Sequence, residues 1–97
     1  MSEKSKPQIT ITYCPRCNWL PRSAWMAQEI LGTFDGEVGE VTLAPSDVAG
    51  HFEIRIDDGL LWCRKADGGF PGVKELKQRV RNRVAPGRDL GHVDDKA

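Results

Sequence analysis

The chain has 97 residues, which suits one compact domain and is too short for two. Hydrophobic residues make up 39% of it and charged residues 29%, a balance typical of globular rather than disordered chains. Fourteen basic and fourteen acidic residues cancel, so no global field favours nucleic acid or an anionic membrane surface. The start of the chain lacks the apolar core of a signal peptide, and no apolar run reaches the ~20 residues of a membrane span, so we expect a cytoplasmic protein with no membrane partner.

The first half of the chain predicts a strand, a helix and a second strand. Alternation of apolar with polar residues predicts a strand over 8–13. A helix follows from Pro15 or Asn18 to Phe34, with Asn18 as a plausible cap and Pro21 acceptable only in the first turn. A second strand is expected over 37–43. The helix is expected to bury a stripe of apolar residues at helical spacing: Leu20, Ala24, Ala27, Leu31 and Phe34, widened by Trp19, Met26 and Ile30.

The second half predicts a hairpin and a final helix. Residues 44–50 read as a loop, and strands over 52–57 and 60–64 are joined at Asp58-Gly59. A glycine-rich loop over 66–72 leads to a helix over 73–85, which Pro86-Gly87 ends. The apolar stripe of that helix is expected to be Val73, Leu76, Val80 and Val84.

The order of these elements is β-α-β-β-β-α. We therefore predict an α/β fold, a thioredoxin-like two-layer sandwich in which two helices pack on a mixed four-stranded sheet. A right-handed crossover makes the first two strands parallel. The domain is expected to span 8–86, with flexible termini over 1–7 and 87–97.

A Cys-x-x-Cys motif, Cys14 and Cys17, stands where the first strand meets the first helix. In a chain without a secretory signal this motif near a βαβ pattern favours thiol–disulfide exchange. Exchange needs an attacking thiolate and a second thiol that resolves the mixed disulfide, and the motif supplies both. Arg16 between the cysteines is a cation that would lower a thiol pKa, and Pro15 stiffens the turn.

Two other readings compete with redox exchange. A structural zinc site needs about four ligands, and here Cys63, His51 and His92 would have to complete one Cys-x-x-Cys pair, so no metal is expected. The cysteines could also serve a redox-responsive interaction module without turnover. The basic residues of the last helix flank its apolar stripe on both sides, which fits long stems covering the core edge better than a nucleic-acid face.

Three motifs in order resemble the selenoprotein W/T/H (Rdx) family. They are Tyr13-Cys14-x-x-Cys17, Gly50-x-Phe52-Glu53-Ile54 and Lys65-x-Asp67-Gly68-Gly69-Phe70, and together they cover roughly residues 8–85. The resemblance implies a thioredoxin-like fold and a thiol-based redox role that can involve glutathione. In the selenocysteine-containing members the position that matches Cys17 holds selenocysteine, so the ordinary cysteine here implies milder reactivity.

Two arguments disagree on which cysteine attacks. Thioredoxin logic favours Cys14 as the more exposed thiol, with Cys17 resolving, whereas the resemblance favours Cys17. Our expectation assigns attack to Cys14 and resolution to Cys17, on a protein disulfide or on glutathione as partner, with no bound cofactor. The residues expected to contact the partner are Pro15, Arg16, Trp19, Ala49, Gly50 and Phe52.

Overall fold

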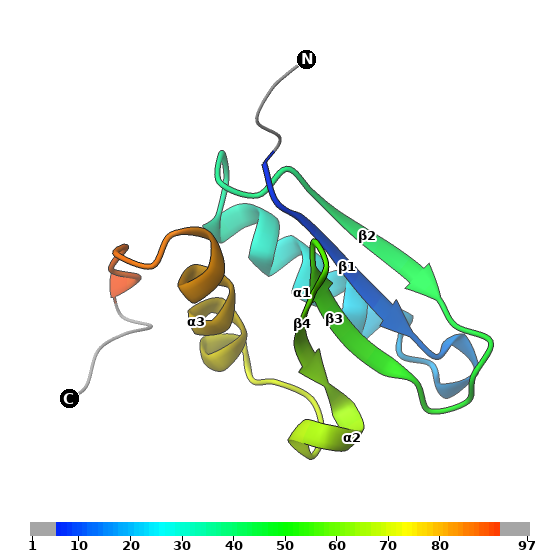
Figure 1. The fold of residues 1–97 in the computed structure, drawn as a ribbon. Helices are drawn as coiled ribbons and strands as arrows, with labels where there is room; N and C mark the ends of the chain where they lie inside the picture. The colour runs from blue at the N-terminus through cyan, green and yellow to red at the C-terminus, as the bar shows by residue number, and fades with distance from the viewer. Residues whose placement is uncertain (1–5, 92–97) are drawn as a thin grey trace.

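A four-stranded mixed sheet organises the computed structural model, which describes residues 6–91. The strands lie in the order β2-β1-β3-β4, with β1 parallel to β2 and antiparallel to β3, and β3 antiparallel to β4 (Figure 1). The elements along the chain are β1 (Gln8–Tyr13), a 3₁₀ turn η1 (Pro15–Cys17), α1 (Leu20–Thr33), β2 (Glu40–Pro45), β3 (Phe52–Ile56), β4 (Gly59–Cys63), α2 (Arg64–Asp67) and α3 (Val73–Val84).

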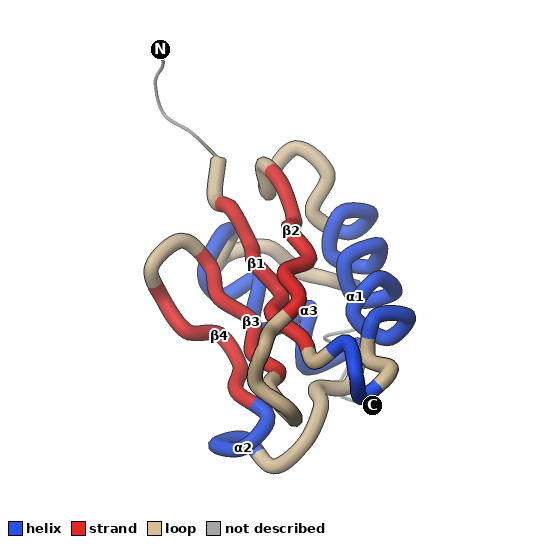
Figure 2. Tube along the Cα trace, turned by 90° about the vertical axis from the view of Figure 1, so that its right-hand side faces the viewer, coloured by secondary structure: helices blue, strands red, loops and turns tan. Residues whose placement is uncertain are grey.

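The sheet has one buried face, on which α1 and α3 lie (Figure 2). Along β1, Ile9 and Ile11 are fully buried while Thr10 and Thr12, which alternate with them, are only half-buried. The two helices also contact each other, and Lys77 Nζ of α3 lies 2.9 Å from Glu29 Oε1 of α1. This arrangement confirms the predicted two-layer sandwich, its strand order along the chain and the parallel pairing of the first two strands.

A short additional helix, α2, departs from the prediction. Residues 64–67 form one helical turn, where the sequence predicted the end of a strand at residue 64 and a loop from residue 66. The carboxylate of Asp67 accepts a hydrogen bond from the Cys63 backbone N–H at 2.9 Å, and Gly68 ends the turn in the left-handed region at φ 80°. With α2, the described fold has three α-helices rather than the predicted two. A single helical turn is too short to show periodicity in a sequence, which is why the prediction missed it.

The buried face of α1 includes Met26, Ala27, Ile30 and Phe34 as predicted, but it is rotated away from the two leucines of the predicted stripe. Leu20 and Leu31 were expected in the core, yet they are 46% and 44% exposed. The predicted stripe and the stripe that is buried both have helical spacing, but the buried one contains Ser23 and therefore looks less apolar in the sequence. The side chains that α1 buries are Ser23, Met26, Ala27 and Ile30, followed by Phe34 at its end. On α3 the prediction is closer, because Leu76 and Val80 are buried and Val73 and Val84 are half-buried.

Two element boundaries also differ. Asn18 does not cap α1: it adopts a left-handed conformation at φ 61° that ends η1, and Trp19 takes the cap position of α1. Asparagine tolerates that conformation better than most residues, so the predicted continuous helix splits there. The second strand begins at Glu40 rather than at residue 37, because the backbone N–H groups of Glu37 and Val38 bond back to the Phe34 carbonyl.

Side chains of α3 form hydrogen bonds with backbone carbonyls along the outer edge of β4. Arg79 and Arg83, one turn apart on α3, donate hydrogen bonds to the carbonyls of Leu61 at 2.8 Å and Leu60 at 3.0 Å. The guanidinium of Arg79 also lies 4.5 Å from the ring centroid of Trp62. These contacts explain why basic residues flank the apolar stripe of α3, since their stems cross the core edge to reach the strand.

The C-terminal end of the described segment lies close to the core. Arg88 pairs with Glu37, and its guanidinium lies 5.5 Å from the ring centroid of Phe34, while Leu90 packs against the buried cluster. The predicted flexible termini fall in part on residues 1–5 and 92–97, which lie outside the described residues. Within residues 6–91, no helix combines the length and apolar character needed to span a bilayer.

Candidate functional site: a dithiol between β1 and α1

Cys14 and Cys17 lie together at the carboxyl end of β1. Cys14 directly follows the strand, and the 3₁₀ turn folds the chain back so that the Cys17 backbone N–H donates to the Cys14 carbonyl at 3.3 Å. Both thiols are free, and the Sγ of Cys17 donates a hydrogen bond to the Sγ of Cys14 at 2.6 Å. Because a disulfide places its sulfurs about 2.05 Å apart, the pair can close with a small movement.

The two thiols differ in pKa. The hydrogen bond from the Cys17 thiol is the main cause that lowers the pKa of Cys14 below its ordinary value, and backbone N–H groups of Gly50, Cys17 and Arg16 add to it against the opposing effect of burial. The pKa of Cys17 is raised, first because its proton is held in that hydrogen bond and second because of burial. The pair therefore loses a first proton readily and holds the shared second proton tightly.

The solvent exposure of the two cysteines is the reverse of the expectation, which made Cys14 the more exposed. Cys14 is fully buried, and Cys17 is the half-buried thiol that reaches the surface. The expectation that Cys14 is the more exposed thiol is therefore wrong. Cys14 follows the buried Tyr13 and lies out of phase with the alternation of β1, whereas Cys17 is the last residue of the 3₁₀ turn, in which no residue is buried.

An aromatic cluster around Phe70 includes Trp19, which follows Cys17 by two residues in the chain. The ring of Phe70 meets Trp19 edge-on at 4.9 Å and Phe52 at 4.8 Å between centroids. Two guanidinium groups lie on this cluster, Arg22 at 4.3 Å from the Phe70 centroid and Arg64 at 5.1 Å from the Trp19 centroid. Of the predicted partner-contact residues, Trp19 is half-buried here, and Phe52 is 1% exposed and belongs to the core.

The loop between β2 and β3 closes over the dithiol. The guanidinium of Arg16 donates to the Asp47 carbonyl at 2.9 Å, and Arg64 Nε donates to the Gly50 carbonyl at 3.2 Å. Gly50 itself has φ 78°, a left-handed conformation that favours glycine, and its backbone N–H points to Cys14. Ala49 and Pro15 are exposed. Gly50 thus joins the dithiol to Arg64, a residue that no sequence pattern singled out.

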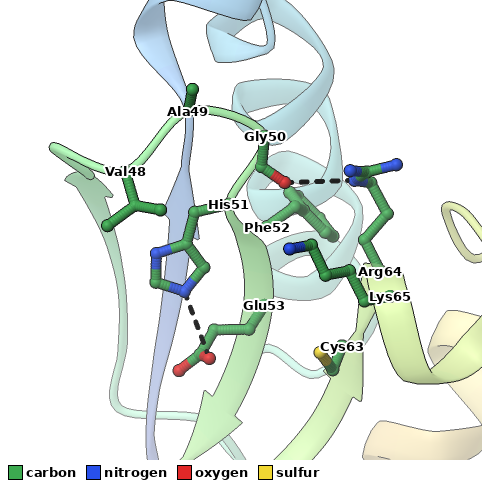
Figure 3. Close-up of a pocket in the computed structure, with 9 residues that line it drawn as sticks. All are labelled: Val48, Ala49, Gly50, His51, Phe52, Glu53, Cys63, Arg64 and Lys65. Carbon is green, nitrogen blue, oxygen red and sulfur yellow. Dashed lines mark hydrogen bonds and ion pairs between the residues drawn. The ribbon is translucent and has the colours of Figure 1, made fainter.

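A pocket of about 180 Å³ opens on the far side of Gly50 (Figure 3). Its walls are the loop before β3 and the end of β4 with the start of α2. In Figure 3 the Arg64 guanidinium lies against the Gly50 carbonyl, and Lys65 extends across the opening above Cys63. The lining residues are Val48, Ala49, Gly50, His51, Phe52, Glu53, Cys63, Arg64 and Lys65.

His51 and Cys63, considered in the sequence as zinc ligands, line this pocket rather than join the dithiol. His51 Nδ1 lies 2.8 Å from Ser46 Oγ and its Nε2 lies 3.2 Å from Glu53 Oε1, so the ring holds the loop to β3. His92 lies outside the described residues. Among residues 6–91, no three or more His, Cys, Asp or Glu side chains are arranged to hold a metal ion.

Comparison with known proteins places this geometry in a family. The Rdx family model matches residues 8–82. A crystal structure from Bordetella parapertussis is 52% identical with a TM-score of 0.79, covering 81% of this chain and 99% of that one. A selenoprotein W-related protein from Vibrio cholerae is 51% identical with a TM-score of 0.78, covering 82% of this chain and 99% of that one. No curated protein matches. With its dithiol, its thioredoxin-like sheet and a match that covers most of its length, the chain belongs to the Rdx family.

Proposed function

We propose that this protein performs reversible thiol–disulfide exchange with a protein disulfide, using Cys14 and Cys17. The observation that carries the proposal is the pairing of the two free thiols at 2.6 Å, with one pKa lowered and one sulfur at the surface. Membership of the Rdx family supports a redox role. A reducing compartment such as the cytoplasm would keep the pair as a dithiol.

In the proposed reaction Cys17 attacks first, because it is the sulfur that a partner can reach. Loss of one proton to solvent leaves a thiolate in the pair, and the shared proton moves along the hydrogen bond so that the charge lies on Cys17. The positive charge of Arg64 favours a thiolate there. The Cys17 sulfur bonds to one sulfur of the partner disulfide, the partner's S–S bond breaks, and its other sulfur leaves as a thiolate.

Cys14 completes the exchange. Its proton passes to the departed thiolate, and its own thiolate, stabilised by the surrounding N–H groups, attacks the Cys17 sulfur. The mixed disulfide breaks and the second partner thiolate is released to take a proton from solvent. In total two electrons and two protons pass from the Cys14–Cys17 dithiol to the partner disulfide, and the protein is left with a Cys14–Cys17 disulfide. An external reductant, glutathione or a dithiol reductase, returns it to the dithiol.

Trapping distinguishes the roles of the two thiols. In a Cys63→Ser background, Cys14→Ser should accumulate a mixed disulfide with a model protein disulfide, while Cys17→Ser should trap little because its remaining thiol is buried. Intact mass measured under non-reducing conditions gives the amount of mixed disulfide in each variant. Trapping only in Cys17→Ser would reverse the roles. The exchange proposal is overturned if neither variant traps a partner and the parent reduces no disulfide. Oxidation-dependent partner binding in that same parent would point instead to a redox-responsive interaction module.

A further inference from the structure

The cations around the dithiol lack acidic partners. Arg16 lies between the two cysteines in the chain, Arg64 acts on Cys17, Arg22 lies on the Phe70 ring and Lys65 lines the pocket. Within residues 6–91 none of these four forms an ion pair with a carboxylate. The acid that lines the pocket, Glu53, is already occupied by Arg55 at 2.6 Å and by His51.

Elsewhere on the helical layer, several cations are paired with carboxylates. Lys77 meets Glu29 at 2.9 Å and Arg88 meets Glu37. Arg79 lies 3.0 Å from Glu75 and 3.6 Å from Asp67. The neutral composition of the whole chain therefore conceals a local excess of positive charge at the redox site.

Two of these cations are held in place before any partner arrives. Arg22 lies on the Phe70 ring, and Arg64 lies on Trp19 while donating to the Gly50 carbonyl. An ion pair formed by a side chain that is already fixed loses less conformational entropy than one formed by a free side chain. Lys65 is exposed and reaches across the pocket mouth (Figure 3).

The pocket lies within reach of a chain that is bonded to Cys17. Gly50 and Arg64 are shared between the two places, because Gly50 directs its N–H to Cys14 and both residues line the pocket. An extended chain advances about 3.3 Å per residue, so a partner cysteine on Cys17 would bring its neighbouring residues to the pocket. The volume of about 180 Å³ is below the range of roughly 300–1,000 Å³ of complete small-molecule sites, so it suits one side chain.

We propose that the exchange partner is a polypeptide with an acidic residue next to its reactive cysteine, and that the pocket beside Gly50 receives that side chain between Arg64 and Lys65. This inference rests on the proposed function and specifies its substrate class. The aliphatic part of a glutamate would contact Val48 and Ala49, and its carboxylate would meet the unpaired cations. Complementary charge at such a rim raises the rate of encounter and selects among partners more than it raises affinity.

The test compares peptides that differ only beside the cysteine. Each peptide carries one cysteine flanked by Glu, Gln or Lys and is linked as a mixed disulfide to 2-nitro-5-thiobenzoate, whose release is followed by absorbance. We expect the Glu peptide to react roughly 1.5- to fivefold faster than the Gln peptide, and the Lys peptide more slowly, since an exposed ion pair contributes about 0.2–1 kcal/mol. Raising the salt concentration should shrink these ratios.

Variants of Lys65 keep the test independent of the thiols. Lys65→Gln should bring the Glu-to-Gln rate ratio closer to one, and Lys65→Glu should make the Lys peptide the faster one. Lys74→Gln removes one exposed cation from α3, away from the pocket, and should leave the ratio unchanged. Equal rates for the three peptides would overturn this inference while the exchange itself stands. Rates no faster than those of free cysteine with every peptide would instead overturn the proposed function.

Discussion

Two adjacent residues of α1 test which face of that helix is buried. Ile30 is fully buried, and Leu31, which the sequence placed in the core, is 44% exposed. Replacing Ile30 by alanine removes roughly 2.4 kcal/mol of transfer free energy, at about 0.8 kcal/mol for each of the three carbon groups lost. The cavity left behind adds to this, so we expect Ile30→Ala to lower the free energy of unfolding by about 3–4 kcal/mol.

Leu31→Ala is the matched control, because it removes the same number of carbon atoms one position away. With almost half of the side chain already in water and no enclosed cavity to leave, its effect should be about 1 kcal/mol. Alanine is also a slightly better helix former than leucine, which reduces the loss further.

Urea unfolding followed by far-ultraviolet circular dichroism measures both free energies, and unchanged m-values show that the two-state comparison holds. A domain of this size is expected to be stable by roughly 5–15 kcal/mol, so both variants remain measurable. Equal losses, or a larger loss for Leu31→Ala, would refute the rotated core face and return α1 to the stripe predicted from the sequence.

Two further predictions concern the dithiol and the core. Cys17→Ala removes the thiol that donates to Cys14, so the pKa of Cys14 should rise. The pKa is measured from thiolate absorbance against pH in a Cys63→Ser background, and the protein with Cys17 intact is the control. An unchanged midpoint would contradict the assigned cause. Ser23→Ala removes a buried hydroxyl that has no hydrogen-bond partner, so the free energy of unfolding should rise by about 1 kcal/mol in the same urea assay. A clear loss of stability would instead show that the hydroxyl makes a hydrogen bond in solution.

Local patterns predicted most of the architecture. Strict alternation located β1 and β3, and Asp58-Gly59 located the hairpin between β3 and β4. The residues of α3 gave one dominant apolar stripe, so its buried face was close to the prediction. Where a helix had two possible stripes, as in α1, spacing alone could not choose between them, because the choice depends on how the helix sits against the sheet.

The dithiol itself was visible in the sequence, but its surroundings were not. Which thiol is buried depends on how the loop at Gly50 closes over Cys14, a contact between residues more than thirty positions apart. The positions of Arg64 and Phe70 follow from α2, whose single turn left no periodic signal. The motif from Lys65 to Phe70 contributes Lys65 to the pocket and Phe70 to the aromatic cluster, two long-range contacts that a local pattern does not encode.

The two edges of the sheet have unequal capacity for growth. At β4, Arg79, Arg83 and Asp67 occupy backbone groups of Leu61, Leu60 and Cys63, so that an incoming strand would have to displace them. At the other edge, β2 has no strand beyond it in the described chain. A sheet that extends indefinitely needs two receptive edges in every copy. With one edge closed, pairing between copies through β2 is isologous and ends at two molecules, so the arginines that cover the edge of β4 also limit strand-by-strand polymerisation.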